Sequence, residues 1–184
     1  FASGVINTPD PLVNPKGVII APGAIVTRGI GNAGHVAGNL IKNISTAATP
    51  VTYEVGDAGT ATAARYTPFT VTFDTVDAPG NLRGYTVIGD HPGTTTGNND
   101  IDPALSVNRY WSLQQAGAGP SGLTTFSATV NYIDPDDVDG AMPDIIMQRY
   151  DGTAWDSFSV TNASSSGGVG TVSGSGATAG SGAK

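Results

Sequence analysis

The stretch Phe69-Thr70-Val71-Thr72-Phe73 decides the fold class of this chain. Apolar and polar residues alternate strictly along it, so a β-strand here would place its apolar side chains on one face and its threonines on the other. The same alternation recurs at Val51-Thr52-Tyr53-Glu54-Val55. A strand at residues 107–113 is expected to bury Val107, Trp111 and Leu113 on one face. Strands with one buried face need a second layer to cover them, so the pattern predicts packed sheets.

Further strand-like segments follow one another at short spacing, separated by turns rich in Gly, Pro and Asp. Asp151-Gly152 between two such segments indicates a β-hairpin, because a type I′ turn needs positive φ at both central residues. Eight to ten short strands at this spacing predict an all-β fold, an antiparallel β-sandwich of the Ig-like or jelly-roll-like kind. The other expected strands are residues 18–21, 24–27, 36–44, 82–88, 126–133, 145–150 and 153–160.

Composition narrows the classes of function. Only 12% of the 184 residues are charged, the net charge is −7, and there is no cysteine. An acidic chain lacks the basic surface that nucleic acid requires. The sequence also has no run of about 18 apolar residues, so no membrane insertion is expected. The chain begins at Phe1 rather than Met, as a processed, exported protein or a trimmed one would. We therefore expect a secreted, extracellular protein of the cell surface.

The chain divides into three parts by composition. Residues 1–30 contain four prolines and predict an extended N-terminal segment that could serve as an inter-subunit strand. Residues 31–163 are expected to form the sandwich. Residues 164–184 are almost entirely small and predict a Gly/Ser-rich strand or tail, which would be flexible unless a sheet of the same chain or of a neighbouring copy held it.

An ordered set of motifs runs through the middle of the chain. In order, these are Gly34-His35-Val36-Ala37-Gly38-Asn39-Leu40, Val55-Gly56, Tyr66-Thr67-Pro68-Phe69-Thr70-Val71, Gly89-Asp90-His91-Pro92, Ser106-Val107-Asn108-Arg109-Tyr110-Trp111, Asp137-Val138-Asp139, and Arg149-Tyr150-Asp151-Gly152 followed by Trp155. With these motifs, residues 30–160 resemble β-sandwich modules of large secreted bacterial surface proteins, often those exported by the type IX route. The resemblance implies an extracellular β-sandwich without catalysis. The end of the chain departs from it, because a Gly/Ser tail stands where a sorting domain would be expected.

A cluster of aspartates is the candidate metal site. Calcium takes six to eight oxygen ligands, and an Asp-rich loop can supply several. The spacing does not match an EF-hand, so a solvated turn in which Asp caps backbone amides is the alternative. The candidate ligands are Asp134, Asp136, Asp137, Asp139 and Asp144. No other cofactor is expected.

Two further groups could carry chemistry. His91 follows Asp90, but no G-x-S-x-G nucleophile motif is present, so a turn is the better interpretation and no enzymatic activity is predicted. Arg109, Trp111 and Trp155 could line a carbohydrate-binding surface, although the pattern of residues 107–113 favours Trp111 as a core residue.

Few charges guard the edges of the predicted sheets, and unpaired strand edges recruit other strands. The leading hypothesis is a non-enzymatic structural subunit that forms a homo-polymer, a pilus-like filament or a surface layer, by donating a strand to its neighbour. The alternative is a calcium-supported adhesin or carbohydrate-binding module with a glycan or another surface protein as partner. The expected interface residues are Val5, Ile6, Val18, Ile19, Ile20, Ile25 and Val26.

Overall fold

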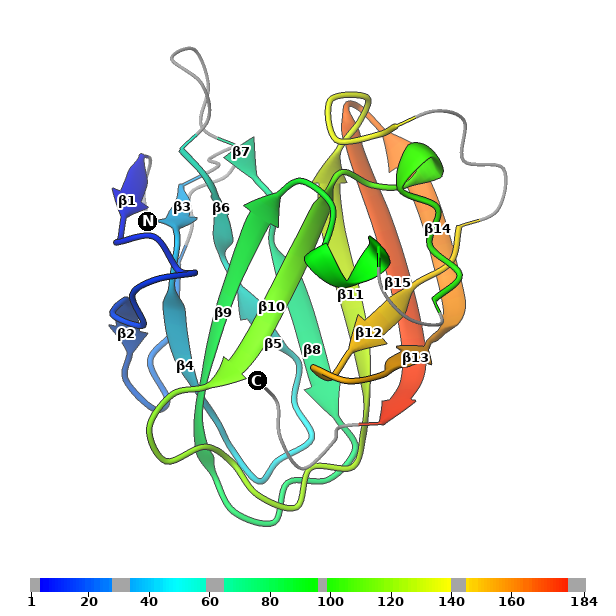
Figure 1. Cartoon of the computed structure of the whole chain (residues 1–184). Coiled ribbons are helices and arrows are strands. Elements are labelled where there is room, and N and C mark those ends of the chain that lie inside the picture. Colours follow the sequence, from blue (N-terminus) through cyan, green and yellow to red (C-terminus); the bar gives the residue numbers. More distant parts are fainter. Residues whose placement is uncertain (1–3, 28–33, 59–64, 96–98, 140–144, 179–184) are drawn as a thin grey trace.

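The computed structural model describes residues 4–27, 34–58, 65–95, 99–139 and 145–178, and these form an all-β architecture of packed sheets (Figure 1). The predicted β-sandwich is therefore confirmed. The described residues contain two short 3₁₀ turns, η1 (Pro92–Thr95) and η2 (Pro103–Leu105), and no α-helix. Within these parts of the chain, no helix is long and apolar enough to cross a membrane.

One layer is a five-stranded antiparallel sheet in the order β14-β15-β11-β8-β5. The predicted alternation is present in β8, where Phe69, Val71 and Phe73 are buried and the two threonines are half-buried. The strands are β5 (Val51–Tyr53), β8 (Phe69–Phe73), β11 (Thr125–Ile133), β14 (Ser159–Ser166) and β15 (Val169–Thr178).

The facing layer is a four-stranded sheet in the order β10-β9-β4-β2. Its last strand, β2, runs parallel to β4, whereas the other neighbours are antiparallel. The strands are β2 (Val18–Ile20), β4 (Leu40–Ile44), β9 (Gly80–Ile88) and β10 (Arg109–Gln115).

A smaller sheet has the strand order β1-β3-β6-β7. Its strands are β1 (Val5–Asn7), β3 (His35–Ala37), β6 (Val55–Asp57) and β7 (Arg65–Tyr66).

The core lies between these layers. The rings of Tyr53 and Phe69 stack with centroids 4.8 Å apart, and Gly84 of the opposite sheet lies against both. A Cβ at Gly84 would stand 2.4 Å from a Tyr53 ring carbon, so the two rings occupy the space that a side chain on β9 would need. Leu40, Leu82, Val130 and Tyr132 continue the same buried layer.

The N-terminal segment pairs with its own chain. β1 lies parallel beside β3, and β2 lies beside β4. The buried Asn39 strengthens this attachment, because its side-chain amide donates to the carbonyl oxygens of Asn14 (2.7 Å) and Lys16 (3.1 Å). The expectation that these strands lack a sheet of their own is therefore corrected: each already has one neighbour within the chain.

The predicted strand at residues 36–44 is divided between β3 and β4. Gly38 separates them with φ +112°, a conformation that L-residues rarely adopt, and a Cβ there would stand 2.1 Å from Thr8 Oγ1. The hairpin predicted from strands at residues 145–150 and 153–160 is present with shorter strands, β12 (Gln148–Tyr150) and β13 (Trp155–Ser157). Its turn spans four residues rather than the expected two, because Asp151 Oδ1 accepts bonds from the amides of Thr153 and Ala154, each at 2.8 Å.

The Gly/Ser-rich segment is part of the sandwich through residue 178. β14 crosses the predicted boundary after residue 163, and β15 lies between β14 and β11. Two glycines make room for aromatic side chains: a Cβ at Gly170 would lie 1.9 Å from the Tyr132 ring, and one at Gly174 would lie 2.7 Å from Phe158 Cβ. The sequence predicts that this segment is ordered only if a sheet of the same chain or of a neighbouring copy holds it. In the structure it pairs with a sheet of the same chain.

The contact between Gly170 and Tyr132 is testable. We expect Gly170→Ala to lower the free energy of unfolding by about 1–3 kcal/mol, because the added methyl group overlaps the ring. The same substitution in a Tyr132→Leu background should cost clearly less, since the clashing ring is gone. Urea denaturation of the four proteins measures both costs, and equal costs in the two backgrounds would refute the assignment.

Candidate functional site: an open apolar cleft

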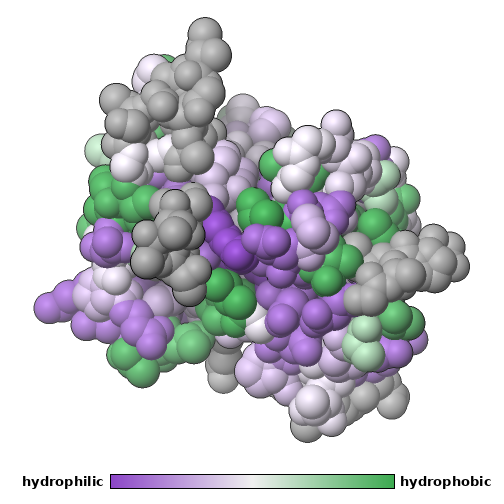
Figure 2. Space-filling model, turned by 90° about the horizontal axis from the view of Figure 1, so that it is seen from above, coloured by the Kyte–Doolittle hydropathy of each residue, from purple (hydrophilic) through white to green (hydrophobic). Residues whose placement is uncertain are grey.

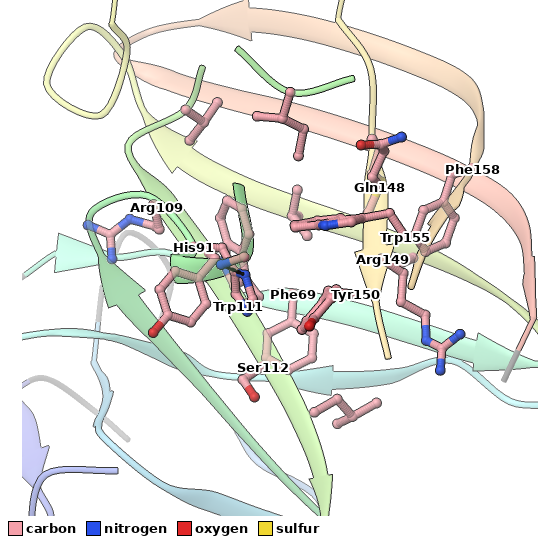
Figure 3. Close-up of a pocket in the computed structure, with 18 of the residues that line it drawn as sticks. Phe69, His91, Arg109, Trp111, Ser112, Gln148, Arg149, Tyr150, Trp155 and Phe158 are labelled. Carbon is pink, nitrogen blue, oxygen red and sulfur yellow. Dashed lines mark hydrogen bonds between the residues drawn. The ribbon is translucent and has the colours of Figure 1, made fainter. Parts of the chain in front are cut away.

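A cleft of about 930 Å³ opens into the core between β10 and the β12–β13 hairpin (Figure 3). Its lining includes residues of the five-stranded sheet, among them Phe69, Phe126 and Val172. Trp111 and Leu113 of β10 belong to the same lining. The cleft is therefore an unclosed part of the sandwich interior rather than a depression in a polar surface.

The cleft exists because β10 is the last strand of its sheet. β9 pairs with one side of β10, and no described strand pairs with its other side. Several large apolar residues pack against the core here but stay only partly buried, including Trp111, Leu113 and Met147. Trp111 is anchored by its indole N–H, which donates to the Thr67 carbonyl oxygen at 3.0 Å. This confirms Trp111 as a core-facing residue.

Four rings gather at one side of the cleft (Figure 3). The His91 ring lies 4.9 Å from Tyr110, 5.2 Å from Tyr150 and 5.4 Å from Trp155, measured between centroids. Nδ1 of His91 accepts a bond from the Gly93 amide at 3.0 Å, so the proton of the neutral ring is on Nε2. Burial in this cluster lowers the pKa of His91 below its usual value. His91 does follow a strand in a turn, as predicted, but the sequence did not indicate its aromatic neighbours.

A buried ion-pair cluster stabilises the end of β10. Arg109 has a fully buried side chain and contacts both Asp137 carboxylate oxygens, at 2.9 and 3.1 Å, and Asp57 at 3.0 Å. Arg65 approaches the same carboxylate at 3.3 Å and Asp136 at 2.9 Å. Because a buried charge is costly unless it is paired, this cluster ties the loop after β11 to β10 and β6. From the sequence, Arg109 is a candidate for a carbohydrate-binding surface, whereas in the structure its side chain is wholly buried in this ion-pair cluster.

The predicted calcium ligands do not converge within the described residues. Asp137 and Asp136 are paired with arginines, and Asp134 accepts a hydrogen bond from Ser165. The backbone amide of Asp139 donates to Ser106, and Asp144 lies outside the described residues. In the parts of the chain that the structure describes, no three His, Asp or Glu side chains are grouped to hold a metal ion. Calcium binding stays a prediction.

The predicted interface residues divide into two sets. Ile6, Ile19 and Ile25 are exposed, with 68% of Ile19 and 88% of Ile25 accessible. The other four are partly buried, and among them Val18 and Ile20 pack against the core. Only the exposed set is available to a neighbour without rearrangement. The partly buried residues are Val5, Val18, Ile20 and Val26.

Comparison with protein-family models, with curated proteins and with solved structures finds no match to this chain.

The ion-pair cluster can be tested by neutralising one carboxylate. We expect Asp137→Asn to lower the free energy of unfolding by about 3–5 kcal/mol, because it leaves the buried Arg109 charge undercompensated. Asp156→Asn is the matched control, since Asp156 pairs with Arg149 but its side chain is 47% exposed, and its loss should cost about 1 kcal/mol or less. Chemical denaturation gives both values. Similar small costs for the two variants would contradict the structural role of Asp137.

The lowered pKa of His91 makes a prediction about pH. Below its unperturbed value of about 6.5 the unfolded chain binds a proton on this ring more readily than the folded chain does, so stability should fall as pH decreases through that value. Unfolding midpoints between about pH 7.5 and pH 5 measure the effect. In His91→Gln the unfolding midpoint should depend less on pH over this range. A dependence on pH equal to that of the wild type would show that His91 is not its cause.

Proposed function

We propose that this chain is a non-enzymatic extracellular structural subunit that assembles with copies of itself by β-strand addition, into a filament, a pilus-like fibre or a surface layer. The observation that carries the proposal is the character of its sheet edges. β14 ends the five-stranded sheet and has eight residues, all exposed, none charged and none proline. Edge strands of soluble monomers are usually guarded by charges or proline.

The edges of the four-stranded sheet also have no strand neighbour among the described residues. β2 carries the exposed Ile19, and β10 borders the open cleft. Other large apolar residues are exposed as well, including Leu12 at 60% and Val13 at 80%. Figure 2 shows apolar surface in several separate patches beside hydrophilic surface. Extracellular location and homo-polymerisation rest on the composition and on these edges.

Assembly can be observed directly. We expect the purified chain to form regular polymers as its concentration is raised, because main-chain hydrogen bonds between edges and burial of apolar surface both favour association. Sedimentation velocity and negative-stain electron microscopy measure this. A chain that remains monomeric from micromolar to millimolar concentration would rule out the proposed function.

The aromatic cluster favours a second candidate, a carbohydrate-binding module. Tyr110, Tyr150 and Trp155 present rings beside the cleft, and the buried indole Nε1 of Trp155 has no hydrogen-bond partner among the described residues. A sugar could stack on such rings and accept this N–H. Glycan-array binding by a monomer that is lost in Trp155→Phe, which keeps a ring but removes the N–H, would favour this candidate over self-assembly.

A further inference from the structure

Among the described residues, the four-stranded sheet ends in two different strands that have a free edge, which makes it the best-defined route to an open polymer. β2 ends the sheet on one side and β10 ends it on the other. In Figure 1, β2 and the β12–β13 hairpin beside the cleft lie on opposite sides of the view. A contact that joins two different surfaces of identical subunits does not close on itself unless its rotation happens to form a ring. Pairing of β2 with β10 of the next copy would therefore propagate.

Charge separates the two edges. Lys16 supplies the positive charge next to β2, whereas Lys42 on the neighbouring strand β4 is already paired with Glu54 at 2.6 Å. Lys16 is exposed and stands two residues before β2. The cleft beside β10 is acidic instead: its lining includes four aspartates, and its two arginines, Arg109 and Arg149, already have carboxylate partners. The four are Asp90, Asp100, Asp102 and Asp151.

Apolar surface matches in the same way. Ile19 on β2 and Ile25 after it are among the most exposed large apolar residues. At the cleft, Leu105 is 49% exposed and Ile146 is 47% exposed, so the rim also presents apolar surface. Within the described residues, both edges thus lack a strand neighbour and expose apolar surface, and the charged residues near them are of opposite sign.

Resting on the proposed function, we infer that the occupant of the β10 edge and its cleft is the β2 edge of a second copy, joined head to tail. The pleat sets which side chains meet. Val18 and Ile20 pack on the core, so Ile19 is on the outer face of the sheet; Trp111 and Leu113 pack on the core, so Ser112 and Gln114 are on the outer face too. In a continuous sheet, Ile19 of one copy lies beside Ser112 or Gln114 of the next, depending on register.

Single cysteines test this contact, because the chain has none of its own. Ile19→Cys is mixed with Ser112→Cys and, separately, with Gln114→Cys, and the assembled protein is oxidised mildly. Neighbouring strands bring such residues within disulfide reach. We expect at least one mixture to give several-fold more cross-linked dimer than either variant alone. Thr161→Cys is placed on β14, the competing free edge, and should cross-link with none of them if β2 and β10 form the contact.

Adding a charge to the edge gives an independent measurement. Ile19→Asp places a charged side chain in the middle of β2, where the fold leaves it exposed and where the contact would set it beside Ser112 or Gln114. Because charges on an edge strand oppose strand addition, we expect the fold to be retained and the critical concentration for assembly to rise at least tenfold. Val160→Asp on β14 is the control and should leave it nearly unchanged. Near-ultraviolet circular dichroism confirms that both variants fold.

The outcomes distinguish the two proposals. Polymers that cross-link through Thr161→Cys, but in neither Ile19 mixture, would overturn the β2–β10 contact and leave self-assembly standing. A wild-type chain that never assembles overturns both. An apolar dye that stays in the cleft without hindering assembly would assign the cleft to a small ligand and overturn the contact. Displacement of the dye during assembly supports it.

Discussion

The packing of two pleated layers is the constraint on which the rest of this structure depends. One layer presents Tyr53 and Phe69 as a stacked pair, and the other presents Gly84 against them. Because strands alternate their side chains, placing this face inward also sends the threonines of β8 outward. The inward faces of β4, β9 and β11 then complete one continuous core. The cleft is where this layering stops, beside the last strand of the four-stranded sheet.

Glycine and aromatic residues complement one another between neighbouring strands of the five-stranded sheet. A strand as poor in large side chains as β15 cannot contribute much apolar area of its own, yet it is held between two neighbours. Gly170 and Gly174 leave space that the Tyr132 ring and the Phe158 side chain occupy. The aromatic residue thus buries its own ring and covers the backbone of its neighbour, which lets a segment of linker-like composition become an interior strand.

Two kinds of residue at β10 have different roles. Arg109 at the start of the strand is fully buried and paired with Asp137 and Asp57, which fixes where the strand begins. Trp111 and Leu113, two and four residues later, stay partly exposed toward the cleft. A strand that is held firmly at one end and uncovered along one edge is a suitable acceptor for another strand, since binding there requires little reordering of the acceptor.

The sequence by itself determined the fold class, because the alternation at residues 69–73 and the turn residues are local signals with a fixed period. It also predicted Trp111 as core and a hairpin around Asp151-Gly152. Only the tertiary structure decided that Asp137 is an arginine partner, that β1 and β2 join sheets of their own chain, and that four rings meet around His91. These features bring together residues such as Arg65 and Asp137, or His91 and Trp155, that are more than sixty positions apart. The period of the hydrophobic pattern and the composition carry no information about such pairs, because the order of the strands in the sheets determines which distant residues become neighbours.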